Sequence, residues 1–492
     1  MNTNVKMKLN FDTYRDQVYA CWLGKNIGGT MGTPYEGTHE ILDIHGFASE
    51  AGAPLPNDDL DLQLVWLHAV EKIGPRAVNA STLGEFWLSF LPPHWNEYGI
   101  GKINMKRGLI PPLAGDYHNP WKHSNGAWIR TEVWACMAPA CPDLAAKYAI
   151  EDAKVDHGAG EGTFAAAFVA AMQSAAFVVK DLRKCIEIGL SEIPAESRMA
   201  DSIRLVMECY DNGTPAMEAR NIIQQRNADI GDGWFEAPSN VAYAVLGLLY
   251  GEGDFKKSMI IAINCGDDTD CTGATVGATM GILGGMKVIP ADWQAHIGDE
   301  IVTISIDRGG ACRKVPATCT ELTDRVVAQA PHMLFANDAY VALTDGAEEL
   351  PENVEDFVAS NCQFLEVTSA FKPYSMHFDF TFASVDVVLD DAPDIAPLGE
   401  RKVSVLVTNN GQTYDRGYYN LSLRWWLPDG FSVEGGKQTL LLPRKDRRQS
   451  GTVSTEFTLR AGETVGANNR CVLEIVAEGR HTPMYVPVLL LG

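Results

Sequence analysis

The sequence pattern changes near residue 370, and this change limits the chain to folds with at least two parts. Up to about residue 305, apolar residues recur at helical spacing, and loops rich in Pro and Gly separate the periodic segments. After residue 370, short β-branched and aromatic runs follow one another, with turn sequences such as Pro428-Asp429-Gly430 between them. A chain of 492 residues is also longer than one hydrophobic core usually serves. We therefore expect a multidomain protein.

Three regions follow from this pattern. We expect residues 1–305 to form an all-α domain, residues 306–369 a mostly helical connecting segment, and residues 370–492 an immunoglobulin-like β-sandwich. The expected helices are Phe11–Gly29, Asp59–Ile73, Asn125–Met137, Cys141–Asp152, Gly162–Val179, Asp181–Leu190, Met199–Tyr210, Met217–Asn227, Ser239–Tyr250, Phe255–Asn264 and Thr272–Leu283. The expected strands are Met376–Leu389, Lys402–Asn409, Asn420–Trp426, Gln438–Pro443, Gly451–Arg460, Arg470–Ala477 and Met484–Leu490.

Two of the expected helices carry glycine at regular intervals. Gly24 and Gly28 lie in one helix, and Gly273, Gly277 and Gly281 lie in the other. Glycine inside a helix costs up to about 1 kcal/mol relative to alanine. The simplest interpretation is that these glycines let the helix backbones approach closely in the core, and that this packing offsets the cost.

The composition disfavours several classes of partner. Forty basic and 63 acidic residues give a net charge of −23, and a field of this sign repels nucleic acid and anionic membranes. No segment has the roughly 18 apolar residues of a membrane span, and the N-terminal residues lack the apolar core of a secretory signal. The 11 cysteines have no paired spacing, which is typical of reduced residues. We therefore expect a cytoplasmic protein with no membrane or nucleic-acid partner.

Two acidic clusters carry the strongest chemical signal. They are Asn57-Asp58-Asp59-Leu60-Asp61 and Asp267-Asp268-Thr269-Asp270. Each stands where a helix is expected to begin, and a helix N-terminus favours ionised Asp but cannot neutralise a whole cluster. If the fold brings the clusters together, their mutual repulsion requires a cation. Oxygen ligands without a nearby His or Cys pattern indicate Mg²⁺, with Mn²⁺ and Ca²⁺ as further candidates, and disfavour Zn²⁺. The alternative, that each Asp only caps its helix, stays open.

Three further segments carry polar groups that could join such a site. Glu36 lies on a glycine-rich loop, which lacks the Gly-Lys-Ser/Thr ending of a phosphate-binding loop. Asn125 and Gly126 open a helical segment, where Asn125 either caps the helix or binds a sugar or phosphate. His157 has no companion at metal-ligand spacing, so a structural role is its default. Covalent acyl transfer is disfavoured because no Gly-x-Ser-x-Gly or recognisable cysteine nucleophile motif occurs.

The order of these motifs resembles the ADP-ribosylglycohydrolase family, which includes the hydrolases that remove ADP-ribose from proteins. The resemblance covers roughly residues 11–305 and rests on Gly24–Gly37, Asn57–Leu62, Asn125–Arg130, Asp156-His157 and Gly266–Cys271. It implies a compact all-α domain with a binuclear Mg²⁺ centre that hydrolyses N- or O-glycosidic bonds to ADP-ribose. The β-sandwich is not part of the family's minimal form, so the chain looks like a divergent member with an added domain.

The resemblance also implies roles for individual residues. The metal ligands fall on Asn57, Asp58, Asp59, Asp268 and Asp270. Glu36 matches a loop glutamate that acts in catalysis in some members, and Asn125, Gly126 and His157 fall where ribose and phosphate are bound. Asn57, Leu60 and Cys271 each replace a threonine of the family pattern, and a thiol is a poor Mg²⁺ ligand. The chain is therefore expected to hold one or two Mg²⁺ ions.

We expect a Mg²⁺-dependent hydrolase of an N- or O-glycosidic bond to ADP-ribose or a related ribosyl group, free or attached to protein. Glu36 or Asp59 is expected to handle the proton. Two alternatives stay open: a glycosidase for another sugar or nucleoside without diphosphate, and a catalytically inactive sugar-binding or structural protein. A homo-oligomer is compatible with each of them.

Overall fold

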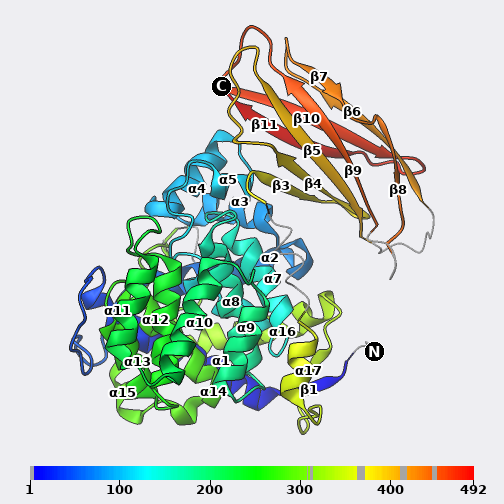
Figure 1. Ribbon diagram of the computed structural model, residues 1–492. Coiled ribbons are helices and arrows are strands. Elements are labelled where there is room, and N and C mark those ends of the chain that lie inside the picture. The colour runs from blue at the N-terminus through cyan, green and yellow to red at the C-terminus, as the bar shows by residue number, and fades with distance from the viewer. Residues whose placement is uncertain (1–4, 307, 311–313, 363–371, 411–417, 446–450) are drawn as a thin grey trace. The chain divides into compact units, whose positions relative to one another are not determined.

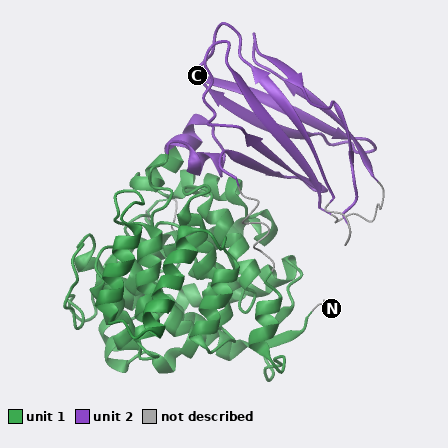
Figure 2. Ribbon diagram, viewed as in Figure 1, with its two compact units in different colours: residues 1–102, 119–370 green, residues 103–118, 371–492 purple. Residues whose placement is uncertain are grey.

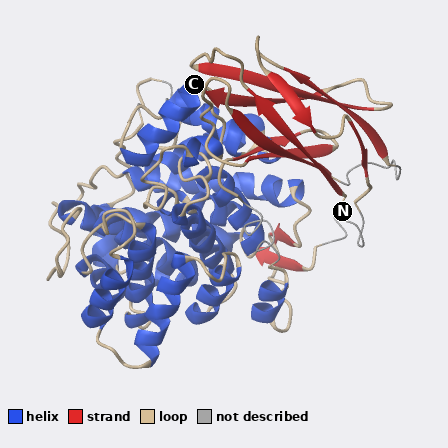
Figure 3. Ribbon diagram, turned by 45° about the horizontal axis from the view of Figure 1, so that its top comes forward, coloured by secondary structure: helices blue, strands red, loops and turns tan. Residues whose placement is uncertain are grey.

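The computed structural model describes residues 5–306, 308–310, 314–362, 372–410, 418–445 and 451–492 (Figure 1). The chain divides into two compact units (Figure 2). Residues 1–102 and 119–370 form the first, called the helical unit, and residues 103–118 and 371–492 form the second, called the β unit. Helices dominate the first unit and antiparallel sheets the second (Figure 3), so the expected multidomain fold class is confirmed.

Most helices of the helical unit begin and end within a few residues of the expected positions. Its helices are α1 (Phe11–Gly32), α2 (Asp58–Ile73), α3 (Ala80–Phe90), α6 (Glu132–Met137), α7 (Pro142–Ala153), α8 (Glu161–Ala176), α9 (Leu182–Ser191), α10 (Arg198–Asp211), α11 (Ala216–Asn227), α12 (Ala237–Tyr250), α13 (Phe255–Asn264), α14 (Thr269–Gly284), α15 (Ala291–Ile297), α16 (Cys319–Ala336) and α17 (Val354–Ser360). Helix α4 (Asn96–Arg107) begins in this unit and ends in the β unit. No helix in the described ranges combines the length and apolarity needed to cross a bilayer.

The segment expected to connect the two regions belongs largely to the helical unit. Its described residues contribute α16, α17 and the strand β2 (Val341–Thr344). This strand pairs in parallel with β1 (Met7–Asn10), so that Met7 lies opposite Val341. A small parallel pair was not expected from the sequence.

Helices α1 and α14 pack with almost no side chain between their backbones, as the glycine spacing predicts. A Cβ at Gly28 would lie 2.1 Å from the carbonyl oxygen of Gly273, and one at Gly24 would lie 2.2 Å from that of Gly277. At the end of α1, the Thr269 hydroxyl donates a hydrogen bond to the Gly32 carbonyl (2.9 Å). The close packing therefore holds the end of α1 beside the beginning of α14.

The Gly28→Ala substitution is expected to lower the free energy of unfolding by about 1–3 kcal/mol, because the added methyl group would overpack this contact. Chemical denaturation of the full chain measures the change. Gly46→Ala is a matched control, since no atom lies within 4 Å of its Cβ position. Equal stability of the two variants would contradict the close packing.

The β unit contains two antiparallel sheets, consistent with a β-sandwich. One sheet has the order β11-β10-β6-β8 and the other β3-β4-β5-β9-β7. The strands are β3 (Ser375–Asp379), β4 (Ala383–Leu389), β5 (Glu400–Asn409), β6 (Tyr419–Trp426), β7 (Ser432–Gly435), β8 (Thr439–Leu442), β9 (Thr452–Arg460), β10 (Asn468–Ala477) and β11 (Met484–Leu491). The expected strand Met376–Leu389 is a hairpin of β3 and β4, because Phe380 and Ala383 close a turn by a hydrogen bond of 2.9 Å. Alternate residues of β5 are buried, as in a strand with one face on a core.

The core of the β unit includes residues from the segment 103–118, which lies within the region expected to be all-α. Leu109, Leu113 and Tyr117 are buried in one cluster with strand residues such as Val403. Leu113 opens the short helix α5 (Leu113–Asp116), and the Tyr117 hydroxyl donates to Asp394 (2.6 Å). The segment 103–118 is therefore an integral part of this unit.

Candidate active site

The two aspartate clusters meet in the helical unit, beside a cavity of about 590 Å³. Asn57 caps α2 by accepting a hydrogen bond from the Asp59 N–H (2.7 Å), and Asp268 directly precedes α14. The Asn57 amide donates to Asp270 across the two helix starts (3.4 Å). The cavity is lined by Thr33, Glu36, Pro56, Asn57, Asp58, His94, Trp95, Asn96, Glu97, Tyr98, Ser124, Asn125, Gly126, Ile129, Phe235, Asp268, Asp270, Cys271 and Ile304.

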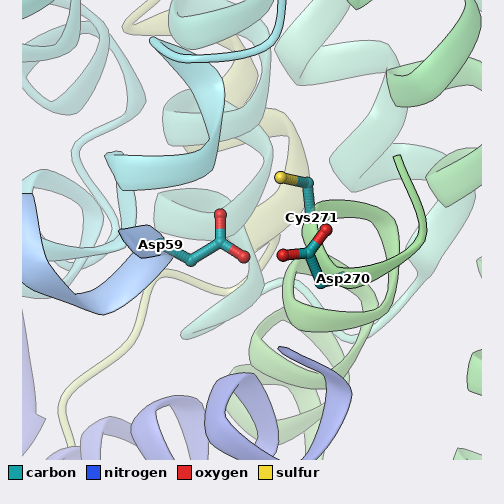
Figure 4. A group of neighbouring side chains, drawn as sticks. All are labelled: Asp59, Asp270 and Cys271. Carbon is teal, nitrogen blue, oxygen red and sulfur yellow. The ribbon is translucent and has the colours of Figure 1, made fainter. Parts of the chain in front are cut away.

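Two overlapping sets of side chains are close enough to share an ion. Ligand atoms of Asp59, Asp270 and Cys271 all lie within 4.8 Å of one another, and those of Glu36, Asp268 and Asp270 do so too. Figure 4 shows the carboxylates of Asp59 and Asp270 pointing toward each other from α2 and α14. Because Asp270 belongs to both sets, it is the centre of the cluster.

The carboxylate oxygens of this cluster are poorly neutralised. Both oxygens of Asp59 and one oxygen each of Asp268 and Asp270 are buried without a hydrogen-bond partner. Burial raises the pKa of Asp59 and of Asp270 well above the usual range, and neighbouring carboxylates raise it further. Burial, with a contribution from Glu36, raises the pKa of Asp268 to about 8. Buried acceptor oxygens in this number fit a hard divalent cation.

Asn57 and Cys271 differ in what they offer to such an ion. The amide oxygen of Asn57 already accepts the capping hydrogen bond, and its NH₂ group faces Asp270. Burial and the nearby carboxylates raise the pKa of the Cys271 thiol well above its usual range. The Asn57 oxygen keeps a second lone pair, whereas Cys271 offers only a sulfur atom. The metal-ligand role expected for Asn57 stays a prediction.

Not every aspartate of the two clusters faces the cavity. Asp61 accepts hydrogen bonds from the N–H groups of Ile304 (2.7 Å) and Ser305 (2.5 Å) and holds that loop. Burial raises the pKa of Asp61 to about 7, although these hydrogen bonds oppose the shift. Asp267 accepts from the Phe235 N–H (3.1 Å) and the Asn240 amide (2.8 Å). Both residues position loops.

Asn125 and Gly126 reach the cavity, but not at the start of the helix expected over residues 125–137. That segment forms a 3₁₀ turn (Trp128–Arg130) followed by the short helix α6. The Asn125 amide donates to Asp268 (2.6 Å) and accepts from the Trp128 indole (3.0 Å), so Asn125 positions a carboxylate and caps no helix.

His157 lies behind the residues that line the cavity, and the substrate-binding role that the resemblance implies for it stays a prediction. Its side chain is completely buried. One ring nitrogen lies 2.9 Å from Asp156 and the other 3.3 Å from the hydroxyl of Ser124, which lines the cavity. His157 can therefore support the wall through Ser124 without reaching a ligand itself.

Arg130 fixes the loop that carries Asn125 and Gly126. Its buried guanidinium donates to Asp152 (2.9 Å), to Asp156 (2.8 Å) and to the Gly126 carbonyl (2.5 Å). Burial alone would raise the pKa of Asp156, but Arg130 and His157 lower it to about 2. Burial raises the pKa of Asp152 to about 6 against the opposing effect of Arg130.

A buried polar network lies beneath Asp59. Lys25 is 3.2 Å from Glu132, and both side chains are fully buried. Gln63 and Gln173 each donate to Glu132 (2.9 and 3.1 Å). Lys25 lowers the pKa of Asp59, but the effect of burial is larger.

Sequence reasoning missed one wall of the cavity. Trp95, Glu97 and Tyr98 lie at the start of α4, a helix that was not expected, and the Tyr98 hydroxyl donates to Asp58 (3.2 Å). The available signal was the concentration of aromatic and polar residues after Pro92 and Pro93.

A comparison with protein families agrees with this geometry. The ADP-ribosylglycohydrolase family model matches residues 10–330. This is more than half of the sequence, and the chain belongs to the ADP-ribosylglycohydrolase family. The expectation of a glycosyl hydrolase is thereby confirmed at the level of the family.

Solved structures and curated proteins add little detail. A structure described as an ADP-ribosylglycohydrolase-related protein complex is 20% identical, covers 65% of this chain and 98% of its own, and has a TM-score of 0.41. A FixG-related protein from Vibrio parahaemolyticus is 14% identical, covers 23% of this chain and 97% of its own, and has a TM-score of 0.18. The comparison with curated proteins found no match.

Proposed function

We propose that the helical unit is a Mg²⁺-dependent hydrolase of an N- or O-glycosidic bond to ADP-ribose or a related ribosyl group. The substrate is a small molecule or a group attached to protein. The observation that carries this proposal is the set of buried, unpartnered oxygens of Asp59, Asp268 and Asp270 beside the cavity. Membership of the family supports the reaction class.

The residues that would hold the metal are Asp58, Asp59, Asp268 and Asp270, with help from Asn57. One or two Mg²⁺ ions suit this set, with Mn²⁺ as a second candidate. When bound, the metal would supply a Lewis acid that orients sugar hydroxyls or a water molecule. Asn57 supports the site by capping α2, and Asn125 holds Asp268 in place.

Glu36 is the better of the two candidates for proton transfer. Its side chain is exposed at the cavity, whereas Asp59 is only 1% exposed and does not line the cavity. Partial burial and the charge of Asp58 raise the pKa of Glu36, and a base works best when its pKa lies near the working pH. We therefore propose Glu36 as the proton-handling group and Asp59 as a metal ligand.

Adding Mg²⁺ to metal-free protein is expected to stabilise it by about 2.7 kcal/mol at a concentration 100 times the dissociation constant. Thermal unfolding in EDTA and in Mg²⁺ measures this effect. Release of ADP-ribose or of other sugars from a glycoside panel measures the reaction. The absence of both Mg²⁺-linked stabilisation and hydrolysis would refute the proposal.

Two alternatives keep specific support. The negative charge of the cavity suits a glycoside of another sugar or a nucleoside without diphosphate. The substitutions at Asn57 and Cys271 suit a protein that binds sugar without turnover. A cytoplasmic location and a homo-oligomeric state remain proposals from the sequence.

A further inference from the structure

Glu97 is a buried carboxylate in the cavity wall that the proposed reaction does not use. Its side chain is 6% exposed, and its Oε2 atom has no hydrogen-bond partner. A Cβ at Gly126 would lie 2.1 Å from its Oε1 atom, so the glycine leaves the room that this carboxylate occupies. The carboxylate has a hydrogen bond with Ser124, so the Oε2 atom is the one left for a donor. A buried carboxylate oxygen without a partner is costly unless a ligand provides a hydrogen-bond donor.

The cavity wall is strongly acidic. Glu36, Asp58, Glu97, Asp268 and Asp270 all line it, and the described lining residues include neither Lys nor Arg. A diphosphate is normally held by such cations or by the N–H groups at a helix start. Asp58, Asp268 and Asp270 are proposed metal ligands, so Glu36 and Glu97 are the carboxylates left to repel a phosphate when metal is bound.

The helix starts beside the cavity are also occupied. Helices α2 and α14 begin with aspartates of the cluster, and helix α4 has Glu97 in its first turn. Helix α12 begins with Ala237 and Pro238: the Ala237 N–H donates to the His123 carbonyl (2.8 Å), and proline has no N–H. These helix starts therefore offer little to a phosphate group.

Aromatic side chains complete this part of the wall. Trp95 and Tyr98 stack with ring centroids 6.3 Å apart, and Trp95 remains 45% exposed. An exposed aromatic face beside a carboxylate suits a ring that is apolar on one face and carries hydrogen-bond donors at its edge. Sugars and nucleosides have this character.

We propose that the cavity takes a phosphate-free glycoside, such as a nucleoside, and that Glu97 accepts a hydrogen bond from a hydroxyl or amino group of this ligand. Trp95 and Tyr98 cover the apolar face of the ligand. The inference rests on the proposed function and narrows its substrate class. Glu97 is a specificity-determining residue in this scheme, and the bond-breaking step stays with the acidic cluster.

Calorimetric titration of the full chain in Mg²⁺ with ribose, adenosine and ADP-ribose tests the substrate class. We expect ADP-ribose to bind no more tightly than adenosine. Tighter binding of ADP-ribose by about tenfold or more, equal to about 1.4 kcal/mol from the diphosphate, would overturn the inference. The titration needs no turnover, so it decides the inference even if no glycoside is hydrolysed and the proposed function fails.

The Glu97→Gln variant tests the anchor. We expect its affinity for adenosine to fall about tenfold, because a hydrogen bond to a charged acceptor becomes a neutral one. Glu85→Gln, at an exposed position of α3, is the matched control. Denaturation curves show whether each variant is folded. We expect the Glu85→Gln protein to keep its affinity for adenosine. Unchanged adenosine affinity in a folded Glu97→Gln protein would remove Glu97 from the proposal.

Discussion

Replacing Asp270 by asparagine is expected to abolish Mg²⁺-dependent hydrolysis and, in the same protein, to raise the stability of the metal-free form. Asp270 lies within 4.8 Å of ligand atoms from both sets of side chains, so its loss should disrupt any ion bound there. We expect the rate to fall by more than about 100-fold, the largest loss usually caused by removing an outer partner of a metal ligand.

The stability gain follows from the sign of the pKa shift. Burial and neighbouring carboxylates raise the pKa of Asp270 in the folded protein. A carboxyl group with a raised folded-state pKa makes the protein less stable as the pH rises past the unfolded-state value of about 4. Asparagine removes this cost, which is about 1.4 kcal/mol for each unit of pKa shift.

Urea denaturation in EDTA at pH 5 and pH 8, together with a hydrolysis assay in Mg²⁺, measures both effects. The gain of Asp270→Asn should be larger at pH 8. Asp345→Asn, at an exposed position, should change neither quantity. An Asp270→Asn protein that keeps its activity and gains no stability would contradict the assignment of Asp270 to the cluster.

The Arg130→Met variant should lose about 3–5 kcal/mol of stability, because it leaves Asp152 and Asp156 buried without their cation. Denaturant unfolding at neutral pH measures this loss. Arg183→Met breaks an exposed ion pair with Asp211 and should cost less than about 1 kcal/mol. If Arg130→Met lost as little stability as Arg183→Met, the buried ion pairs of Arg130 would not hold the loop that carries Asn125 and Gly126.

The same variant has a pH signature. Arg130 and His157 hold the pKa of Asp156 at about 2, so the stability from this group is present above about pH 4 and disappears as the pH falls toward 2. The difference between Arg130→Met and the unchanged protein should therefore shrink over this range.

Local patterns predicted much of the helical unit. Helical periodicity placed α13 at its observed bounds and α2 within one residue, because the apolar stripe and the Asp-rich start lie within a single segment. The glycines of α1 and α14 indicated close packing, and this packing brings the ends of the two helices together. The sequence allowed the proposal that Asp59 and Asp270 lie close together, but their proximity depends on the tertiary packing of the helical unit.

Helix α4 and Glu97 could not be predicted in this way. The helix contains Gly99 and Gly101 and follows two prolines, so its intrinsic helix propensity is low. Lys102 stabilises it by donating hydrogen bonds to the carbonyls of Pro92 (3.1 Å) and Pro93 (2.7 Å). Tertiary contacts of this kind have no local sequence signature, and the proposed role of Glu97 depends on them.

The participation of residues 103–118 in the core of the β unit has a consequence for the ancestry of the protein. Exchange of gene segments normally moves one continuous stretch of chain, and a domain appended at a terminus can be transferred in this way. The β unit cannot be transferred so simply, because Leu109, Leu113 and Tyr117 would stay behind and its hydrophobic interior would be incomplete. Descendants of this protein should therefore inherit residues 103–118 and the C-terminal strands of the β unit together or lose both.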